Sequence, residues 1–167
     1  MFPGLDYRRR RLLKAAPAGP LHDYLETTFP DRGTDYREIE FLALDLETTG
    51  LNPARDEILS VGMVVLKGGH IRLASAEHHL VVPEQAIPER SAVVHQITDD
   101  TAASGRPLAD VLGLVLSRLA GRVMLGHHVR VEREFLDAAC RRQYGSGFLA
   151  HGFIVPRNGY HFCNVVG

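Results

Sequence analysis

The chain has 167 residues, of which 45% are hydrophobic and 23% are charged, and its formal net charge is -1. This length and balance are typical of one folded domain and exclude a disordered chain. A charge near zero excludes a protein that coats nucleic acid through bulk positive charge, and no apolar run is long enough for a transmembrane helix. Cys140 and Cys163 have no metal-ligand or disulfide spacing, which favours a reducing, cytoplasmic location.

Residues 1–36 are predicted to form an N-terminal lead-in. Prolines and glycines interrupt this segment, and we expect one short helix within it, over His22–Thr28. Arg8 to Arg11 form a basic run without the apolar stretch of a secretory signal. The run favours a solvated leader, and contact with phosphate groups or a membrane surface is the open alternative.

The predicted domain, residues 37–145, begins with three strands. Apolar patterns predict strands over Ile39–Glu47, Ile58–Leu66 and Ile71–Val82. The sequence Lys-Gly-Gly-His at 67–70 predicts a tight hairpin turn, because consecutive glycines tolerate positive φ. Three consecutive strands joined in this way predict an antiparallel meander.

Two helices and a strand follow. An apolar stripe predicts a helix over Pro107–Ala120, then a buried strand over Arg122–Gly126 and a second helix over His128–Tyr144. This order predicts an α/β domain in which helices pack on a mixed sheet. The last 22 residues, 146–167, contain no aspartate or glutamate and no clear periodicity, so they are predicted to form an atypical C-terminal tail.

Two acids in the first strand are the main candidates for chemistry. Alternate residues of a strand share a face, so Asp45 and Glu47 point one way while Leu44 and Leu46 point into the core. Neighbouring carboxylates repel each other, and a hard divalent cation such as Mg²⁺ or Mn²⁺ removes that repulsion. The open alternative is a strand end with two solvated acids.

A third acid is predicted on the second helix. The helical spacing places Glu132 on the inward face with Phe135 and Leu136. An acid in apolar surroundings needs a partner, because burying it unpaired is costly. If this helix crosses the strand of Asp45, Glu132 joins the same metal site; otherwise an ion pair with Arg130 or Arg133 is expected.

These residues also carry a resemblance to a family. The sequence Leu-Asp-Leu-Glu-Thr-Thr-Gly-Leu at 44–51 resembles the first motif of the DEDD-type 3′→5′ exonucleases, the DnaQ-like family that includes DNA polymerase III epsilon subunits. Residues 94–99 are similar to the family's His-Gly-Ile-Thr loop, and residues 125–136 resemble its second motif. The three matches follow the family's order.

The resemblance implies an RNase H-like fold and two-metal hydrolysis of phosphodiester bonds at the 3′ ends of single-stranded DNA or RNA, with a DNA polymerase subunit as a possible partner. Asp45 and Glu47 are implied to be catalytic ligands of two Mg²⁺ or Mn²⁺ ions. Glu132 stands where the family has an aspartate and is implied to be the third. The residues implied to bind substrate are Leu46, Thr48, Thr49, Gly50, His95 and His128.

The third motif of the family, His and then Asp five positions later, has no counterpart. No aspartate follows Asp137, and the fifth residues after His151 and His161 are Pro156 and Val166. We expect a truncated or frame-shifted C-terminus. A diverged member of reduced activity, or coordination by one of these histidines, is the alternative.

Two other functions fit parts of the pattern. A catalytically inactive pseudo-exonuclease would hold a nucleic-acid end or a polymerase without cutting, which the absent third motif favours. A phosphatase loop resembling that of the haloacid dehalogenases would use Asp45 as a nucleophile. Glu47 and the two other exonuclease motifs argue against this last function.

Overall fold

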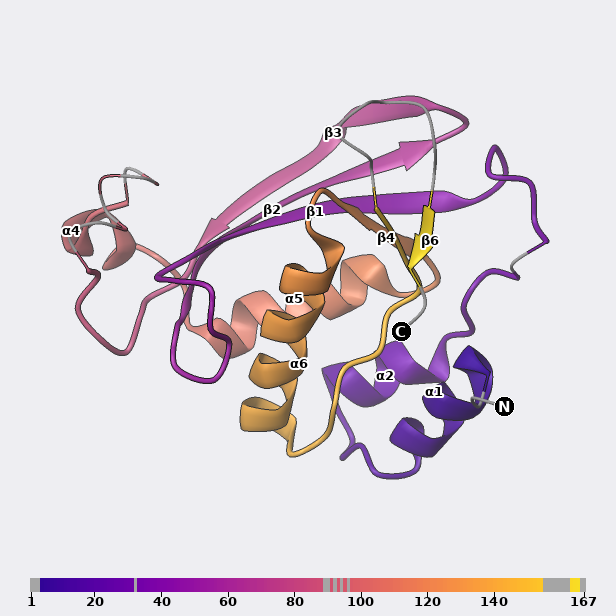
Figure 1. Ribbon diagram of the computed structural model, residues 1–167, viewed down its shortest axis with the longest axis horizontal. Coiled ribbons are helices and arrows are strands. Elements are labelled where there is room, and N and C mark those ends of the chain that lie inside the picture. The colour runs from indigo at the N-terminus through magenta and orange to yellow at the C-terminus, as the bar shows by residue number, and fades with distance from the viewer. Residues whose placement is uncertain are drawn as a thin grey trace.

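The computed structural model describes residues 4–31, 33–88, 91, 93, 95, 97–154 and 163–165. No helix in this part of the chain is long and apolar enough to cross a membrane. In chain order the elements (Figure 1) are α1 (Leu5–Leu13), α2 (Pro20–Glu26), β1 (Glu40–Thr48), β2 (Ile58–Lys67), β3 (His70–Leu80), α4 (Asp99–Ala102), α5 (Leu108–Leu119), β4 (Val123–Gly126), α6 (Val129–Tyr144), β5 (Gly152–Ile154) and β6 (Cys163–Val165).

The strands form one mixed sheet in the order β3-β2-β1-β4-β5-β6. β1, β2 and β3 are the predicted antiparallel meander, and β4 lies parallel to β1. The predicted fold class, an RNase H-like mixed sheet with flanking helices, is therefore confirmed. β5 lies parallel to β4, and β6 pairs antiparallel with β5. Neither was predicted, because strands of three residues are too short to show an alternating pattern.

Glycines set the turn and the helix end that the sequence predicted. Gly68 and Gly69, between β2 and β3, have φ of +58° and +78°, which suits a tight hairpin turn. Gly145 has φ of +68°, and its N–H donates to the carbonyl of Arg141, which closes α6. The predicted helix began at His128, and α6 begins one residue later, at Val129.

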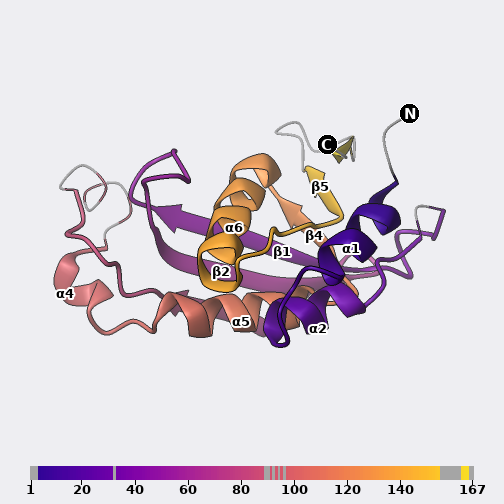
Figure 2. The same cartoon turned by 90° about the horizontal axis from the view of Figure 1, so that it is seen from below.

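α5 and α6 cover one face of the sheet (Figure 2). The main core lies between them and the sheet, where the predicted inward residues Leu42 and Leu44 of β1 are 1% and 3% exposed. A smaller cluster, Ile39, Phe41, Val123 and Leu125, lies apart from it on β1, β4 and the residue before β1. Because successive side chains of a strand alternate, the residues of β1 that do not face the helices share the side of Phe41.

The lead-in contributes to the main core. Leu21, Tyr24 and Leu25 of α2 are at most 1% exposed, and α2 packs against α5. The hydroxyl of Tyr24 donates to the carbonyl of Leu149 at 2.7 Å, and its ring stacks on Phe148 with 5.6 Å between the ring centroids. The first and last thirds of the chain thus meet through α2. The domain boundaries at residues 36 and 145 stay predictions.

The expectation of a solvated arginine leader is wrong for Arg9, whereas Arg10 and Arg11 of α1 are exposed. Arg9 is only 5% exposed; its guanidinium forms an ion pair with Asp6 at 2.8 Å and donates to the backbone carbonyls of Leu25 and Glu26. These bonds fix α1 on α2. Four consecutive arginines are equivalent in sequence, and only the helix geometry turns one of them inward.

Candidate active site

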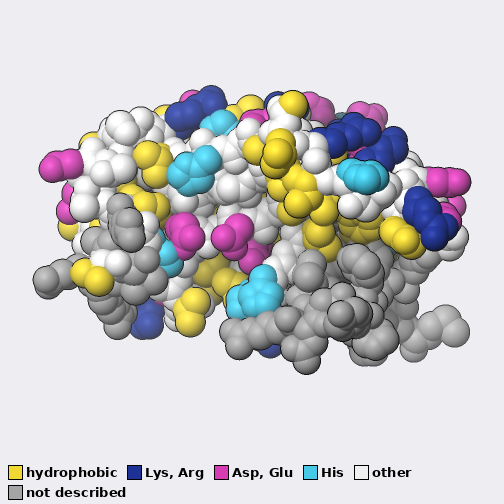
Figure 3. Space-filling view, turned by 90° about the horizontal axis from the view of Figure 1, so that it is seen from above, with side chains coloured by type: hydrophobic (Ala, Val, Ile, Leu, Met, Phe, Trp, Pro, Cys, Tyr) yellow, Lys and Arg dark blue, Asp and Glu magenta, His cyan; other side chains and the backbone are white. Residues whose placement is uncertain are grey.

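Asp45 and Glu47 lie near the end of β1, on the face of the strand opposite Leu44. Asp45 is exposed and Glu47 is partly exposed, whereas Leu46 packs against the main core. The predicted alternation is confirmed. Figure 3 shows acidic side chains gathered in a hollow of the molecular surface, with histidine side chains nearby. Because Asp45 is exposed and Glu47 is partly exposed, both predicted carboxylates are open to a ligand.

β4 ends before it reaches the level of Asp45 on the parallel strand β1, which leaves room beside Asp45. The last pair of β4 with β1 joins Leu125 to Ala43, and β4 ends at the next residue, Gly126. A Cβ on Gly126 would lie 3.3 Å from the carbonyl oxygen of Leu44 and 3.7 Å from the side-chain carboxyl carbon of Glu132. The glycine thus lets Glu132, in the first turn of α6, approach the carboxyl end of β1.

Glu132 is buried there and forms no ion pair with a described lysine or arginine, and the nearby His128 lowers its pKa less than burial raises it. It is 4% exposed, and its Oε2 has no hydrogen-bond partner among the described residues. Burial raises the pKa of its carboxyl group, and the nearby negative charge of Asp45 raises the pKa further. The alternative of an ion pair with Arg130 is wrong, because Arg130 pairs with Glu134 at 2.8 Å. An orphaned oxygen beside a second carboxylate suits a divalent cation.

Glu132→Gln is expected to stabilise the protein by about 1 kcal/mol in EDTA at pH 8, a rise in melting temperature of roughly 3 °C. The folded state raises the pKa of Glu132 above the unfolded value near 4.5, so the ionised group lowers stability at high pH. This loss fades as the pH falls through the folded pKa and vanishes below the unfolded one. The check is thermal unfolding of both proteins between pH 8 and pH 4.

Glu134→Gln serves as the control for that measurement. Its carboxylate is exposed and paired with Arg130, so the substitution should change stability by less than about 0.5 kcal/mol at either pH. A lower melting temperature for Glu132→Gln than for the wild type at pH 8 would contradict the assignment of Glu132 as a buried, unpaired carboxylate.

Glu47 is held by a histidine. His95 Nδ1 lies in direct contact with Glu47 Oε2, and both side chains are partly exposed. Ser91 is buried, and its hydroxyl donates to the carbonyl of Thr48 at 3.1 Å, which ties the segment carrying His95 to the end of β1. The sequence gives no signal for Ser91, because an isolated serine has no distinguishing pattern. The role of His95 in binding substrate stays a prediction.

The Thr48–Gly50 segment is tied into its own loop. The Thr48 hydroxyl donates to the carbonyl of Gly50 at 2.6 Å, and Thr49 Oγ1 accepts from the N–H of Glu57 at 2.9 Å. A Cβ on Gly50 would meet the carboxylate of Asp56, so a larger residue there would displace that side chain. These bonds give the loop a defined shape beside Asp45 and Glu47. Contact of the loop with a nucleotide stays a prediction.

The histidines take different places. His128 is exposed at the N-terminal cap of α6, four residues before Glu132, and its ring lies 4.5 Å from that of His127. His151 is buried at the start of β5, where its carbonyl accepts from the N–H of Met124 at 2.8 Å. It therefore lies beside the middle of β4, and the carboxylates lie past the end of that strand. His161 falls outside the described residues.

The ligand atoms of Asp45, Glu47 and Glu132 do not all lie within 4.8 Å of one another. Among the described residues, one group, His22, Asp23 and Glu26 on α2, has ligand atoms that all lie within 4.8 Å of one another. Two of its three members are exposed and it belongs to a helix of seven residues, so it carries no conclusion. Asp45, Glu47 and Glu132 are spaced more widely, as repelling carboxylates are expected to be.

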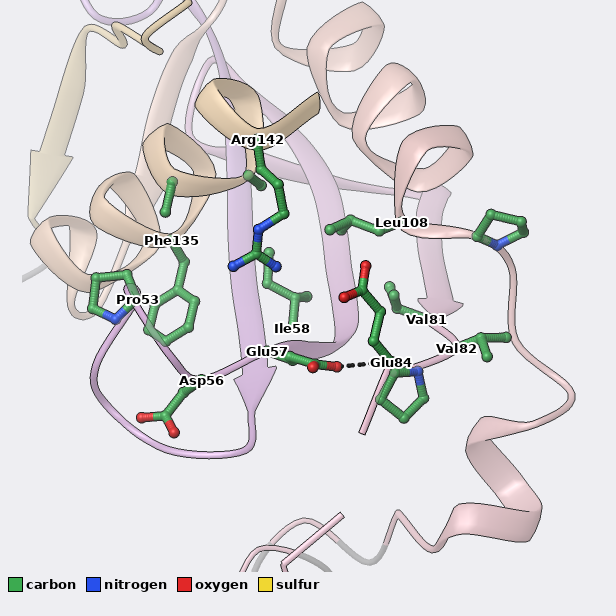
Figure 4. Close-up of a pocket in the computed structure, with 14 residues that line it drawn as sticks. Pro53, Asp56, Glu57, Ile58, Val81, Val82, Glu84, Leu108, Phe135 and Arg142 are labelled. Carbon is green, nitrogen blue, oxygen red and sulfur yellow. Dashed lines mark hydrogen bonds between the residues drawn. The ribbon is translucent and has the colours of Figure 1, made fainter. Parts of the chain in front are cut away.

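A cavity of about 350 Å³ lies elsewhere, between β2, α5 and α6 (Figure 4). Ile58, Leu108 and Phe135 form much of its apolar wall. At its rim Glu57 Oε2 accepts from the N–H of Glu84 at 2.7 Å. None of the predicted site residues lines this cavity. The carboxylates at the end of β1 are therefore a separate site.

The profile of the RNase T-type exonuclease family, described as "Exonuclease", matches residues 42–146, which span β1 to the end of α6. This chain belongs to that exonuclease family. The resemblance seen in the motifs is therefore confirmed, and the three candidate carboxylates lie within the matched part of the exonuclease.

The chain is similar to parts of two kinds of DNA polymerase III protein, and it spans only a fraction of their length. It is 32% identical over 110 residues to the PolC-type DNA polymerase III of Thermotoga maritima, covering 66% of this chain and 8% of that relative. It is 29% identical over 113 residues to the DNA polymerase III epsilon subunit of Treponema pallidum, covering 65% of this chain and 51% of that subunit.

Solved structures support the fold. An exonuclease I without ligand matches with a TM-score of 0.59 at 19% identity, covering 64% of this chain and 25% of that chain. A zinc-bound complex of Escherichia coli exonuclease I with single-stranded DNA matches with a TM-score of 0.59 at 20% identity, covering 64% and 24%. At this level of identity the likeness shows the fold alone.

Proposed function

We propose that this exonuclease domain removes nucleotides from the 3′ ends of single-stranded DNA or RNA in a reaction that needs divalent cations. One observation carries the proposal. In a chain of this family, the buried carboxylate of Glu132 has an oxygen without a partner and lies close enough to Asp45 for that charge to raise its pKa. A cation would compensate both negative charges.

Each candidate site residue has a proposed role in binding the cations or the nucleotide. Asp45, Glu47 and Glu132 would hold Mg²⁺ or Mn²⁺, which the family uses as a pair of ions. When bound, such ions activate water and neutralise charge on the scissile phosphate. His95 holds Glu47 in place. The Thr48–Gly50 loop, with Leu46, and His128 at the cap of α6 would contact the terminal nucleotide.

A second candidate is binding without hydrolysis. No aspartate follows Asp137, and His151 lies beside the middle of β4, away from the carboxylates. The third-motif pair of the family thus has no counterpart among the described residues. In this case the domain would hold a nucleic-acid 3′ end or a DNA polymerase subunit. The names of the polymerase III relatives support such a partner, and a cytoplasmic location is part of the same proposal.

The two candidates are separated by a hydrolysis assay on single strands labelled at either end, with Mg²⁺ or Mn²⁺ and with EDTA. Nuclease activity predicts labelled mononucleotides from the 3′-labelled strand, a ladder from the 5′-labelled strand, and no product in EDTA. Glu47→Gln should lower the rate roughly 100-fold, because it removes a charged ligand. Glu84→Gln, an exposed acid outside the site, is the matched control.

Binding of the strands without product would favour the second candidate. Product that persists in EDTA, or that Glu47→Gln leaves unchanged, would contradict the metal site. A protein that neither binds nor cuts either strand would refute the nuclease and the binding of a nucleic-acid end, and would leave only the binding of a polymerase subunit.

A further inference from the structure

A cleft of about 600 Å³ crosses the outer face of α6 and carries an excess of arginine. α1 and α6 lie on the same side of the sheet (Figure 2), and both helices line the cleft. Four arginines and two acids face it. The residues that matter here are Arg8 and Arg11 of α1, Arg133 and Arg141 of α6, and Pro53 and Ala54 of the loop between β1 and β2.

The acids in the cleft are already paired. Glu134 binds Arg130 at 2.8 Å, and Asp137 binds Arg141 at 2.7 Å while also accepting from the N–H of Phe148. Arg11 and Arg133 form no ion pair within the part of the chain that the structure describes. The cleft therefore keeps a positive charge after its internal pairs are counted.

The arginines of α1 are held in position by the fold. Arg9 points away from the cleft and anchors α1 to the carbonyls of Leu25 and Glu26. Arg8 and Arg11 are three residues apart, so they share another face of the helix, and this face lines the cleft. The anchored backbone of α1 places the side chains of Arg8 and Arg11 at the cleft, so binding a phosphate does not have to order this helix as it would a solvated leader.

The β1–β2 loop and the start of α6 carry residues of both the candidate active site and the cleft. Pro53 lies three residues after Gly50 in the loop that follows β1, and Arg133 directly follows Glu132 at the start of α6. To reach the cleft, a strand whose 3′ end lies at the carboxylates has to bend around the β1–β2 loop, where Pro53 and Ala54 line the cleft.

We propose that this cleft binds the phosphodiester backbone of single-stranded nucleic acid upstream of the 3′ end. The inference rests on the proposed function, and it assigns a role to the arginine run that lies outside the part of the chain matched to the family. Guanidinium groups suit phosphate oxygens through paired hydrogen bonds. The two arginines without ion pairs, Arg11 and Arg133, provide the main contacts.

The test compares two double variants with the same charge change on the same two helices. R11Q/R133Q removes cleft arginines. R10Q/R142Q removes an arginine of α1 that pairs with Asp6 and an arginine of α6 that lines the separate cavity. Binding of fluorescein-labelled oligothymidylates of about 3 and about 20 nucleotides is followed by fluorescence anisotropy, with Ca²⁺ in place of Mg²⁺, across a salt series.

For the long strand, R11Q/R133Q should bind about tenfold more weakly than the wild type at low salt, and the slope of log affinity against log salt should shrink by about 1.4. R10Q/R142Q should stay within about twofold of the wild type. The short strand reaches only the carboxylate site, so all three proteins should bind it alike. R11K/R133K keeps both charges and should recover most of the affinity, which separates charge loss from misfolding.

Equal binding of the long strand by the wild type and both double variants would overturn the cleft and leave the proposed function standing. Equal losses in the two double variants would also overturn it, because net charge alone would then explain the effect. If the wild-type protein binds neither strand and cuts none, the proposed function fails together with the cleft.

Discussion

Asp45→Asn is expected to reduce 3′→5′ hydrolysis by roughly 100-fold to 1000-fold and to weaken Mn²⁺ binding, without unfolding the protein. Asparagine offers a neutral oxygen in place of a charged ligand, so the cation loses electrostatic attraction at the end of β1. The exposed side chain of Asp45 is not part of the core. Its charge also raises the pKa of Glu132, so its removal relieves a repulsion. The melting temperature in EDTA should therefore stay the same or rise.

The measurement combines isothermal titration with Mn²⁺, the hydrolysis assay on a 3′-labelled strand and thermal unfolding in EDTA. Asp100→Asn, an exposed aspartate in the first turn of α4, is the matched control and should leave all three quantities unchanged. Unchanged Mn²⁺ binding in Asp45→Asn would remove Asp45 from the metal site. A clear drop in melting temperature would show that Asp45 stabilises the fold, which contradicts its exposed position.

Tyr24→Ala should lower the free energy of unfolding by about 3–5 kcal/mol. The side chain of Tyr24 is 1% exposed, stacks on Phe148 and donates a hydrogen bond to Leu149, so its truncation leaves a cavity and an unpaired carbonyl. Tyr24→Phe keeps the ring and loses only the hydrogen bond, which is expected to cost about 1–2 kcal/mol. Urea unfolding followed by circular dichroism measures both losses.

Tyr7→Ala is the control from the same lead-in. Tyr7 is 62% exposed, and its truncation should change stability by less than about 0.5 kcal/mol. If Tyr24→Ala cost no more than Tyr7→Ala, α2 would not belong to the core, and α1 would not be anchored as the cleft requires. Comparing the stability losses of the two variants therefore shows whether the lead-in is part of the core or is only attached to it.

Local patterns were enough for the parts of the site that lie on one element. The two-residue period of β1 predicted that Asp45 and Glu47 oppose Leu44, and the structure confirms it. The Gly68-Gly69 pair predicted the turn between β2 and β3, and the apolar stripe of α6 predicted that Glu132 faces inward. Each of these properties repeats along one element or depends on one dipeptide, so each leaves a pattern in the sequence.

The partner of Glu132 was beyond such reasoning. The sequence left a metal site and an ion pair with Arg130 or Arg133 both open. In the structure Arg130 forms an ion pair with Glu134, which lies one helical turn further along α6. Glu132 instead lies in the space beyond Gly126, where β4 ends. Which of these contacts forms depends on where two strands stop relative to each other, and no local pattern records that.

The sequence by itself determined the meander, the two main helices, the exonuclease family motifs and the faces of their carboxylates. Only the tertiary structure decided that the lead-in joins the core through Tyr24, that Arg9 alone of four arginines turns inward, and that β5 and β6 extend the sheet. The physical reason is the range of the contacts. Periodicity and turn chemistry act over a few neighbouring residues, whereas these contacts join segments that are far apart in the chain or choose among identical neighbours.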